Sequence, residues 1–221
     1  MTKIGVFDSG IGGKSIALKL EQLFPEAEII SVDDSKNVPY GTKSEDDIKS
    51  LTLQAIKPLL DTGCDAIVIA CNTATAVAIE TLRITYPDVH FVGIEPMVKP
   101  ASKITKTKTI AVLATPRTLS SERYHNLKNE WAAGINVIEP DCATWAGLIE
   151  SHQLDTIPVE KTITDAINHN ADVIVLGCTH YHWLKERVQA VAGYGVAVLE
   201  PSDAIGARLD SLLATATELR G

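Results

Sequence analysis

Two of the four cysteines in this chain directly follow short apolar runs, where α/β proteins commonly place reactive groups. Cys71 follows Ile67–Ala70, and Cys178 follows Val173–Gly177. Polar residues and then a helical pattern come after each cysteine, so we expect each thiol near the N-terminus of a helix. The partial positive charge there favours the thiolate, which is the reactive form of cysteine.

Two opposed thiols suit one reaction in particular. If the two strand ends face each other across a cleft, one thiolate can remove a proton from a stereocentre while the opposite thiol returns a proton to the other face. Thiols titrate near working pH, so such a pair supplies both a general base and a general acid. The pattern therefore indicates racemisation or epimerisation without a cofactor.

Other polar residues at the predicted strand ends suit a small anionic ligand. Asp8 and Ser9 follow the first apolar run, and Asp8 could accept a proton from an amine or from a catalytic thiol. His180 lies two residues after Cys178 and could assist that thiol in the same way. The remaining candidates are short polar residues and a turn near strand ends: Tyr40, Gly41, Asn72, Thr73, Thr115 and Thr179.

Short β-branched runs alternate with amphipathic stretches along the chain, which is typical of an α/β fold with parallel sheets. Several runs are apolar on both faces, as buried parallel strands are. The predicted strands are Ile4–Phe7, Glu28–Val32, Ala66–Ala70, His90–Val92, Thr109–Leu113, Asn136–Ile138, Val173–Leu176 and Val196–Leu199. The predicted helices are Lys14–Phe24, Glu45–Leu60 with a capping box at Ser44 and Asp47, Thr73–Tyr86, Arg117–Lys128, Pro158–Asn168, Tyr181–Val191 and Ala204–Ala214.

The chain also repeats itself at a separation of 105 to 107 residues. The matching segments are Ile4–Ser9 with Ile110–Thr115, Asp65–Thr73 with Asp172–His180, and Val92–Pro96 with Ala197–Pro201. We therefore predict two similar α/β halves related by a pseudo-two-fold axis, with the active site in the cleft between them. The first domain is 1–96, completed by a C-terminal helix 206–221, and the second is 97–205. The boundary between the two halves lies near Pro96–Pro100.

Composition excludes several classes of protein. The 221 residues carry a net charge of −8, which disfavours binding to nucleic-acid phosphates. The chain contains no apolar run of about 18 residues, as a membrane span requires. Asp8 comes too early for the apolar part of a signal peptide, so we expect none. The cysteines form no C-x-x-C pair and fit no zinc spacing, so we expect no metal. These features predict a cytoplasmic protein without membrane or nucleic-acid partners.

A nucleotide-binding protein is an alternative to a racemase. Gly12-Gly13-Lys14-Ser15 at a strand–helix junction is similar to part of a phosphate-binding loop. The full pattern requires a glycine where Asp8 stands, and a carboxylate there would repel phosphate. A nucleotide-binding function is therefore disfavoured.

The chain resembles the glutamate racemases of the aspartate/glutamate racemase superfamily over essentially its whole length. Four segments carry the resemblance, in the family's order: Gly5–Gly13, Asp34–Gly41, Ile69–Ala76 and Leu176–Tyr181. The resemblance implies catalytic cysteines at Cys71 and Cys178, and substrate contacts from Asp8, Ser9, Tyr40, Gly41, Asn72, Thr73, Thr115, Thr179 and His180. It also implies interconversion of L- and D-glutamate without pyridoxal phosphate or metal, a role in peptidoglycan synthesis, and a homodimer.

One segment departs from the family pattern. Near Cys142, members usually read Cys-Pro and later Val-Pro, whereas this chain has no proline between Asp141 and Glu150 and carries the bulky Trp145. In the family this segment borders the substrate pocket. Two alternatives therefore stay open: a racemase of aspartate or of several acidic amino acids, and a non-catalytic amino-acid-binding protein. Glu150 and His152, at the end of the segment, are not included in the predicted site.

Overall fold

The computed structural model describes residues 1–220, with side chains through Ala214. Residues 1–94 and the segment from Pro201 onward form one compact unit, and Glu95–Glu200 form a second. The division into domains 1–96 and 97–205 stays a prediction. Gly221, the last residue of the predicted helix 206–221, lies outside the described residues.

The first unit contains a four-stranded parallel sheet in the order β2-β1-β3-β4. Its strands are β1 (Lys3–Asp8), β2 (Glu28–Asp33), β3 (Ala66–Ile69) and β4 (His90–Gly93). The two central strands pair in a register that places Phe7 opposite Ile69. Because both strands run in the same direction, the residues that follow them emerge side by side at one edge of the sheet.

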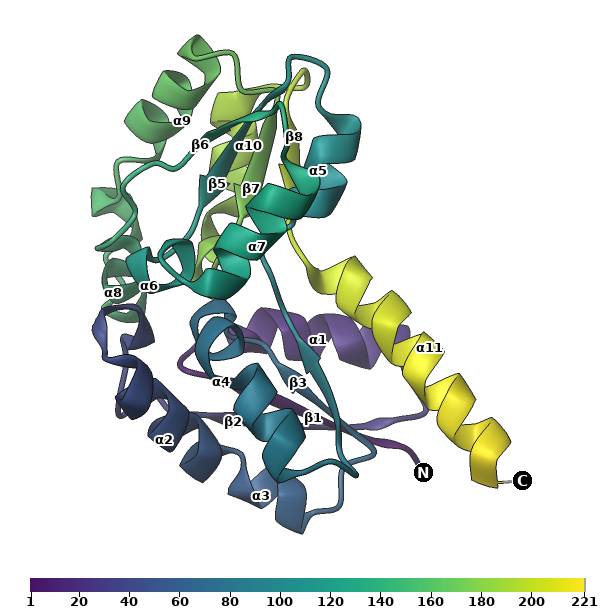
Figure 1. Ribbon diagram of the computed structural model, residues 1–221. Helices are drawn as coiled ribbons and strands as arrows, with labels where there is room; N and C mark the ends of the chain where they lie inside the picture. The colour runs from purple at the N-terminus through teal and green to yellow at the C-terminus, as the bar shows by residue number, and fades with distance from the viewer. Residues whose placement is uncertain (221) are drawn as a thin grey trace. The chain divides into compact units, whose positions relative to one another are not determined.

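Helices cover both faces of this sheet (Figure 1). They are α1 (Gly13–Leu23), α2 (Glu45–Ala55), α3 (Lys57–Asp61), α4 (Asn72–Thr85) and α11 (Ser202–Arg220), with a 3-10 turn η1 (Tyr40–Thr42). Leu20 of α1 and Leu209 of α11 pack on one face, and Ile48 of α2 and Leu82 of α4 pack on the other. Burial on both sides explains why β1 and β3 are apolar throughout.

The second unit contains a parallel sheet in the order β6-β5-β7-β8, which is the same order as in the first unit. Its strands are β5 (Thr109–Leu113), β6 (Asn136–Ile138), β7 (Val173–Leu176) and β8 (Ala197–Leu199). The predicted α/β fold with parallel sheets is therefore confirmed, and each of the eight strands in the described residues overlaps a predicted one.

The helices of the second unit are α5 (Val98–Ile104), α6 (Pro116–Leu119), α7 (Glu122–Trp131), α8 (Trp145–Glu150), α9 (Val159–Asn168) and α10 (Lys185–Ala192), with 3-10 segments η2 (Leu154–Thr156) and η3 (Thr179–Leu184). Helices α5 and α7 pack against β5 and β7, and α9 packs against α10 (Figure 1).

Two helices that the sequence predicts as continuous are interrupted. The predicted helix 45–60 breaks at Ile56. In a continuous helix the ring of Pro58 would clash with the carbonyl of Gln54, four residues earlier. The predicted helix 117–128 breaks before Ser121, whose Oγ accepts a hydrogen bond from the Tyr124 N–H at 3.2 Å and starts α7. A capping serine can therefore begin a new helix within an amphipathic run.

One further prediction differs from the structure, and another is confirmed. Helix α5 begins within 96–100, where Pro100 is tolerated because the first helical turn has no internal acceptor for its N–H. The predicted helix 181–191 begins as the 3-10 segment η3 before α10. The cap at Ser44 is confirmed, since its Oγ accepts from the Asp47 N–H at 3.2 Å and donates to the Asp47 carboxylate at 2.6 Å.

Replacing Gly13 by alanine is expected to lower the free energy of unfolding by about 1–3 kcal/mol. The added Cβ would lie 2.4 Å from the Asp8 Cβ, and neither atom can rotate away, so β1 or α1 must shift. Urea unfolding followed by far-UV circular dichroism measures this loss.

Gly147→Ala is the matched control, because its Cβ would meet nothing within 4 Å. Within a helix, alanine is favoured over glycine by about 0.5–1 kcal/mol, so this variant should be as stable as the parent or more so. Equal destabilisation of the two variants would contradict the close approach at Gly13.

Candidate active site

The first cluster of site residues lies where β1 and β3 end. Ser9 follows β1, and its Oγ is 3.2 Å from the Sγ of Cys71, which follows β3. The Cys71 Sγ also accepts a hydrogen bond from the Ala74 N–H at 3.4 Å and so caps α4. This thiol is 5% exposed, and it occupies the helix N-terminus that the sequence predicts.

Asp8 is a buried carboxylate beside this cluster. Its side chain is 1% exposed, and its Oδ2 accepts a hydrogen bond from the Gly10 N–H at 3.0 Å. Gly13 lets the start of α1 approach the Asp8 Cβ closely, so the glycine-rich turn holds a carboxylate. A buried negative charge here suits a cation such as an ammonium group.

Tyr40 and Gly41 approach the same cluster from η1. The Tyr40 hydroxyl donates to the Asp34 Oδ2 at 2.7 Å, and the Tyr40 side chain is buried. Burial raises the pKa of the Tyr40 phenol most, followed by its hydrogen bond to Asp34, and the negative charges of Cys71 and Asp8 act in the same direction. Tyr40 therefore stays protonated. Its hydrogen bond to Asp34 and its burial fix the ring, and so also fix the backbone of Tyr40 and Gly41.

Asn72 is the residue of this cluster that points most clearly to a ligand. It begins α4 and is 3% exposed, yet neither its Oδ1 nor its Nδ2 has a hydrogen-bond partner among the described residues. Buried polar groups are paired in the large majority of cases, because an unpaired one loses its hydration without compensation. The neighbouring Thr73 is buried as well.

The second cluster lies where β5 and β7 end. Cys178 follows β7 and is 6% exposed, and the preceding Gly177 donates its N–H to the Leu113 carbonyl of β5 at 2.7 Å. Thr115, beyond β5, caps α6, since its Oγ1 accepts from the Thr118 N–H at 3.3 Å. Thr179 is buried next to the thiol.

His180 connects the second thiol to a carboxylate. Its Nδ1 lies 3.7 Å from the Cys178 Sγ, and its Nε2 lies 2.5 Å from Oε1 of Glu150 at the end of α8. The carboxylate accepts the Nε2 proton, which leaves Nδ1 as the nitrogen able to accept the thiol proton. The histidine is 4% exposed, so this chain of groups is shielded from water.

The predicted site omits Glu150. It lies 30 positions before His180, and the sequence around it has no motif that marks it as a partner. The only signal was an acidic residue at the end of the segment that departs from the family pattern. Pairing across that separation is decided by how α8 packs against η3.

None of the four cysteines forms a disulfide bond. Burial raises the pKa of Cys142, with further contributions from the negative charges of Asp141 and Cys178, and burial also raises the pKa of the half-exposed Cys64. Both therefore stay neutral thiols.

Among the side chains that the structure describes, which end at Ala214, no group of three or more His, Cys, Asp or Glu is arranged to hold a metal ion. Within residues 1–220, no helix combines the length and apolar character that crossing a membrane requires.

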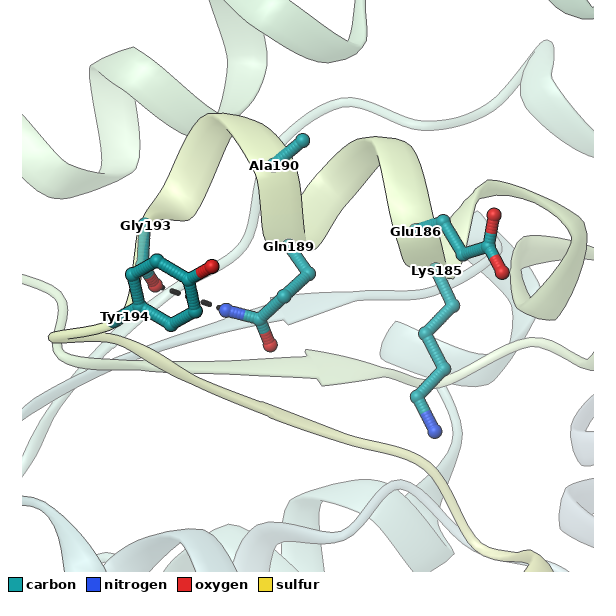
Figure 2. Close-up of a pocket in the computed structure, with 6 residues that line it drawn as sticks. All are labelled: Lys185, Glu186, Gln189, Ala190, Gly193 and Tyr194. Carbon is teal, nitrogen blue, oxygen red and sulfur yellow. Dashed lines mark hydrogen bonds between the residues drawn. The ribbon is translucent and has the colours of Figure 1, made fainter.

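A cavity of about 600 Å³ lies beside α10 (Figure 2). Figure 2 shows the Gln189 amide donating to the Gly193 carbonyl, at 2.9 Å, across one end of it. Its lining consists of Lys185, Glu186, Gln189, Ala190, Gly193 and Tyr194, none of which is a predicted site residue.

Comparison with known proteins identifies the family. The Asp/Glu/hydantoin racemase family matches residues 14–208. The chain belongs to this family. A glutamate racemase from Roseiflexus sp. is 36% identical over 214 residues, covering 95% of this chain and 79% of that protein. One from Clostridium perfringens is 39% identical over 203 residues, covering 90% of this chain and 78% of that protein.

A solved structure agrees with this family membership. The crystal structure of Escherichia coli glutamate racemase in complex with L-glutamate and the activator UDP-MurNAc-Ala has a TM-score of 0.85 and 28% identity to this chain, covering 96% of this chain and 82% of that one. The resemblance seen in the sequence is thus confirmed. Three of the four segments that carry it span the carboxyl ends of β1, β3 and β7, where the two clusters lie, and the fourth follows β2.

Replacing Asn72 by leucine is expected to leave the free energy of unfolding unchanged or to raise it by about 1 kcal/mol. The amide makes no hydrogen bond with the described residues, so its removal breaks none of these and removes a desolvated polar group. Thermal and urea unfolding of the ligand-free protein measure the change.

Thr75→Val is the matched control on the same helix. Thr75 is fully buried, but its Oγ1 donates to the Ile69 carbonyl at 3.0 Å, so this variant should lose about 1 kcal/mol. If Asn72→Leu were the more destabilised of the two, Asn72 would be a structural residue instead of a ligand-binding one.

Proposed function

We propose that this protein interconverts L-glutamate and D-glutamate by exchanging the proton on Cα between two thiols, Cys71 and Cys178. One observation carries the proposal: each unit has a buried thiol, outside any disulfide bond, two residues after the equivalent central strand of a sheet with the same strand order. Membership in a racemase family and the glutamate racemases at 36% and 39% identity support glutamate as the substrate.

The proposed reaction balances with two protons and no redox change. One thiolate accepts the Cα proton of the bound amino acid, and the electron pair left on Cα delocalises into the α-carboxylate. The opposite thiol then donates its proton to the other face of Cα and becomes the new thiolate. The proposal requires that the two thiols reach opposite faces of one substrate, and it uses neither a cofactor nor a metal.

Neighbouring groups make the two thiols chemically different. Cys71 lies beside a serine hydroxyl and a backbone N–H, and neither of these two groups changes charge. Cys178 instead lies beside His180, which can accept the thiol proton and is itself held by Glu150. We propose that His180 assists proton exchange at Cys178, and that Asp8 orients the substrate or accepts a proton in the first unit.

The proposed substrate contacts divide by charge. The buried carboxylate of Asp8 suits the ammonium group of glutamate. The N-terminus of α4 and the unpaired amide of Asn72 suit a carboxylate, because N–H groups and the helix dipole attract negative charge there. The other proposed contacts are Ser9, Tyr40, Gly41, Thr73, Thr115, Thr179 and His180.

The biological role follows from the proposed reaction. D-glutamate is a component of peptidoglycan, so we propose that the protein supplies it for cell-wall synthesis in the cytoplasm. We also propose that it acts as a homodimer.

Cys71→Ser and Cys178→Ser are each expected to lower the rate of racemisation by about 10²–10⁴-fold in both directions. A serine hydroxyl is far less acidic than a thiol, so neither variant retains a complete acid–base pair. The decay of the circular dichroism of L- or D-glutamate measures the rate, with no cofactor added. Cys64→Ser is the control and should retain activity, because Cys64 precedes β3 whereas Cys71 follows it. Full activity in either of the other variants would exclude the two-thiol mechanism.

Racemisation in deuterated water distinguishes a mechanism with two bases from a mechanism with a single base. Product formed from either enantiomer should carry solvent deuterium at Cα, because the proton that is added comes from the opposite thiol. Mass spectrometry of the separated enantiomers measures the label at early times. Transfer of the original proton into the product would indicate a single base that acts on both faces.

The same circular dichroism assay with aspartate tests the choice of substrate. We expect glutamate to be racemised with a higher kcat/KM than aspartate. A decaying signal with aspartate and a constant signal with glutamate would assign the protein to aspartate, and binding of either amino acid without decay would assign it to a binding protein.

A further inference from the structure

We infer that Trp145, Tyr181 and the Cys142 carbonyl form an aromatic clamp that positions Glu150 against His180, and so tunes proton exchange at Cys178. The inference rests on the proposed function, because it assigns positioning residues to the same reaction. Trp145 and Tyr181 are positioning residues in this proposal, because they act on Cys178 through Glu150 and His180.

The two rings of the clamp are completely enclosed. Trp145 is 1% exposed and Tyr181 is 0% exposed. Their ring centroids lie 5.4 Å apart, and their planes cross at 61° in an edge-to-face arrangement. Edge-to-face pairs are favourable because the positive edge of one ring meets the negative face of the other, which defines an orientation as well as a contact.

A shared carbonyl reinforces this contact. The Cys142 carbonyl accepts a hydrogen bond from the Tyr181 hydroxyl at 2.9 Å and another from the backbone N–H of Trp145 at 3.1 Å. The first bond joins η3 to the segment before α8, and the second joins that segment to the first residue of α8. Burial raises the pKa of Tyr181 well above its ordinary value, so its hydroxyl stays protonated and keeps donating.

The clamp holds both partners of the Glu150–His180 pair. Trp145 begins α8 and Glu150 ends it, while Tyr181 is the residue next to His180. At a rise of about 1.5 Å per residue, Glu150 lies about 7.5 Å along the helix from Trp145, so a tilt of about 10° at the clamp would move the carboxylate by about 1.3 Å. A displacement of that size would break the 2.5 Å contact between Glu150 and His180.

The position of α8 depends on the contacts of Trp145 and Tyr181, because this short segment is not rigid by itself. The helix has only six residues, contains Gly147, and lies in a segment without proline from Asp141 to Glu150. A helix of this length is not stable by itself, so its position is determined by packing. Trp145 is the largest fully buried side chain in the chain's described residues, and it stands at the first position of this helix.

Tyr181→Phe tests the clamp, because it keeps the ring and removes only the hydrogen bond to Cys142. We expect kcat for glutamate racemisation to fall by about 10–100-fold, as a misplacement near 1 Å does, while KM changes by less than about threefold. Tyr124→Phe is the matched control: Tyr124 is 1% exposed in the same unit and donates to Glu139 at 2.9 Å, away from the thiols. Equal effects of the two variants on kcat would overturn the proposal.

A double-mutant cycle separates positioning from general damage to the fold. If the clamp acts through Glu150, then Tyr181→Phe should have no further effect on kcat in a Glu150→Gln background. Losses that multiply in the double variant would show that Tyr181 acts independently of Glu150 and would overturn the proposal.

Alkylation distinguishes failure of the clamp from failure of the proposed function. Iodoacetamide labelling of the full chain, resolved by mass spectrometry, compares Cys178 with Cys71 in the same molecule and needs no substrate. In Tyr181→Phe, the labelling rate of Cys178 relative to Cys71 should fall by about fivefold, because a displaced His180 no longer accepts the thiol proton. An unchanged or raised ratio would overturn the clamp even if the protein racemises glutamate, and a lowered ratio would support it even if it does not.

Discussion

Parallel pairing of two central strands is the constraint on which both clusters of site residues depend. In the first unit β1 pairs with β3, and in the second β5 pairs with β7. Residues beyond parallel strands leave the sheet at the same edge, so chain segments that are about 60 residues apart deliver side chains to one place. The 3.2 Å approach of Ser9 to Cys71 is a direct result. Helices on both faces bury these strands, which holds the strand ends in position.

Equivalent placement of the two thiols does not make them chemically alike. In the first unit the thiol caps an α-helix and faces a hydroxyl, and a fixed N–H donor stabilises negative charge on it. In the second unit the thiol is followed by a 3-10 segment, and an ionisable pair, His180 and Glu150, lies beside it. A repeated fold thus carries two different acid–base environments. This difference arises because α8, which lies between β6 and β7, places Glu150 beside His180.

Much of the fold could be predicted from local pattern. Strands that are buried on both faces appear as short β-branched runs, and Val173–Leu176 and Thr109–Leu113 have the predicted bounds for that reason. The ends of helices were harder to predict from the sequence. The amphipathic pattern continues across Ile56 and across Ser120, whereas a proline ring and a serine cap interrupt the backbone there. Hydrophobic periodicity reports which side of a segment is buried, and it does not report whether the backbone hydrogen bonds are continuous.

The amino-acid sequence alone determined the class of fold, the family, and the positions of the two thiols directly after buried strands. Those properties depend on interactions between residues that are near in the chain, or on motifs that need no geometry to be recognised. Only the tertiary structure decided that Glu150 pairs with His180, that Tyr181 bonds to the Cys142 carbonyl, and that the buried amide of Asn72 has no partner among the described residues. These outcomes depend on how α8, η3 and α4 pack, and packing is set by the shapes of side chains that the chain brings together from distant positions.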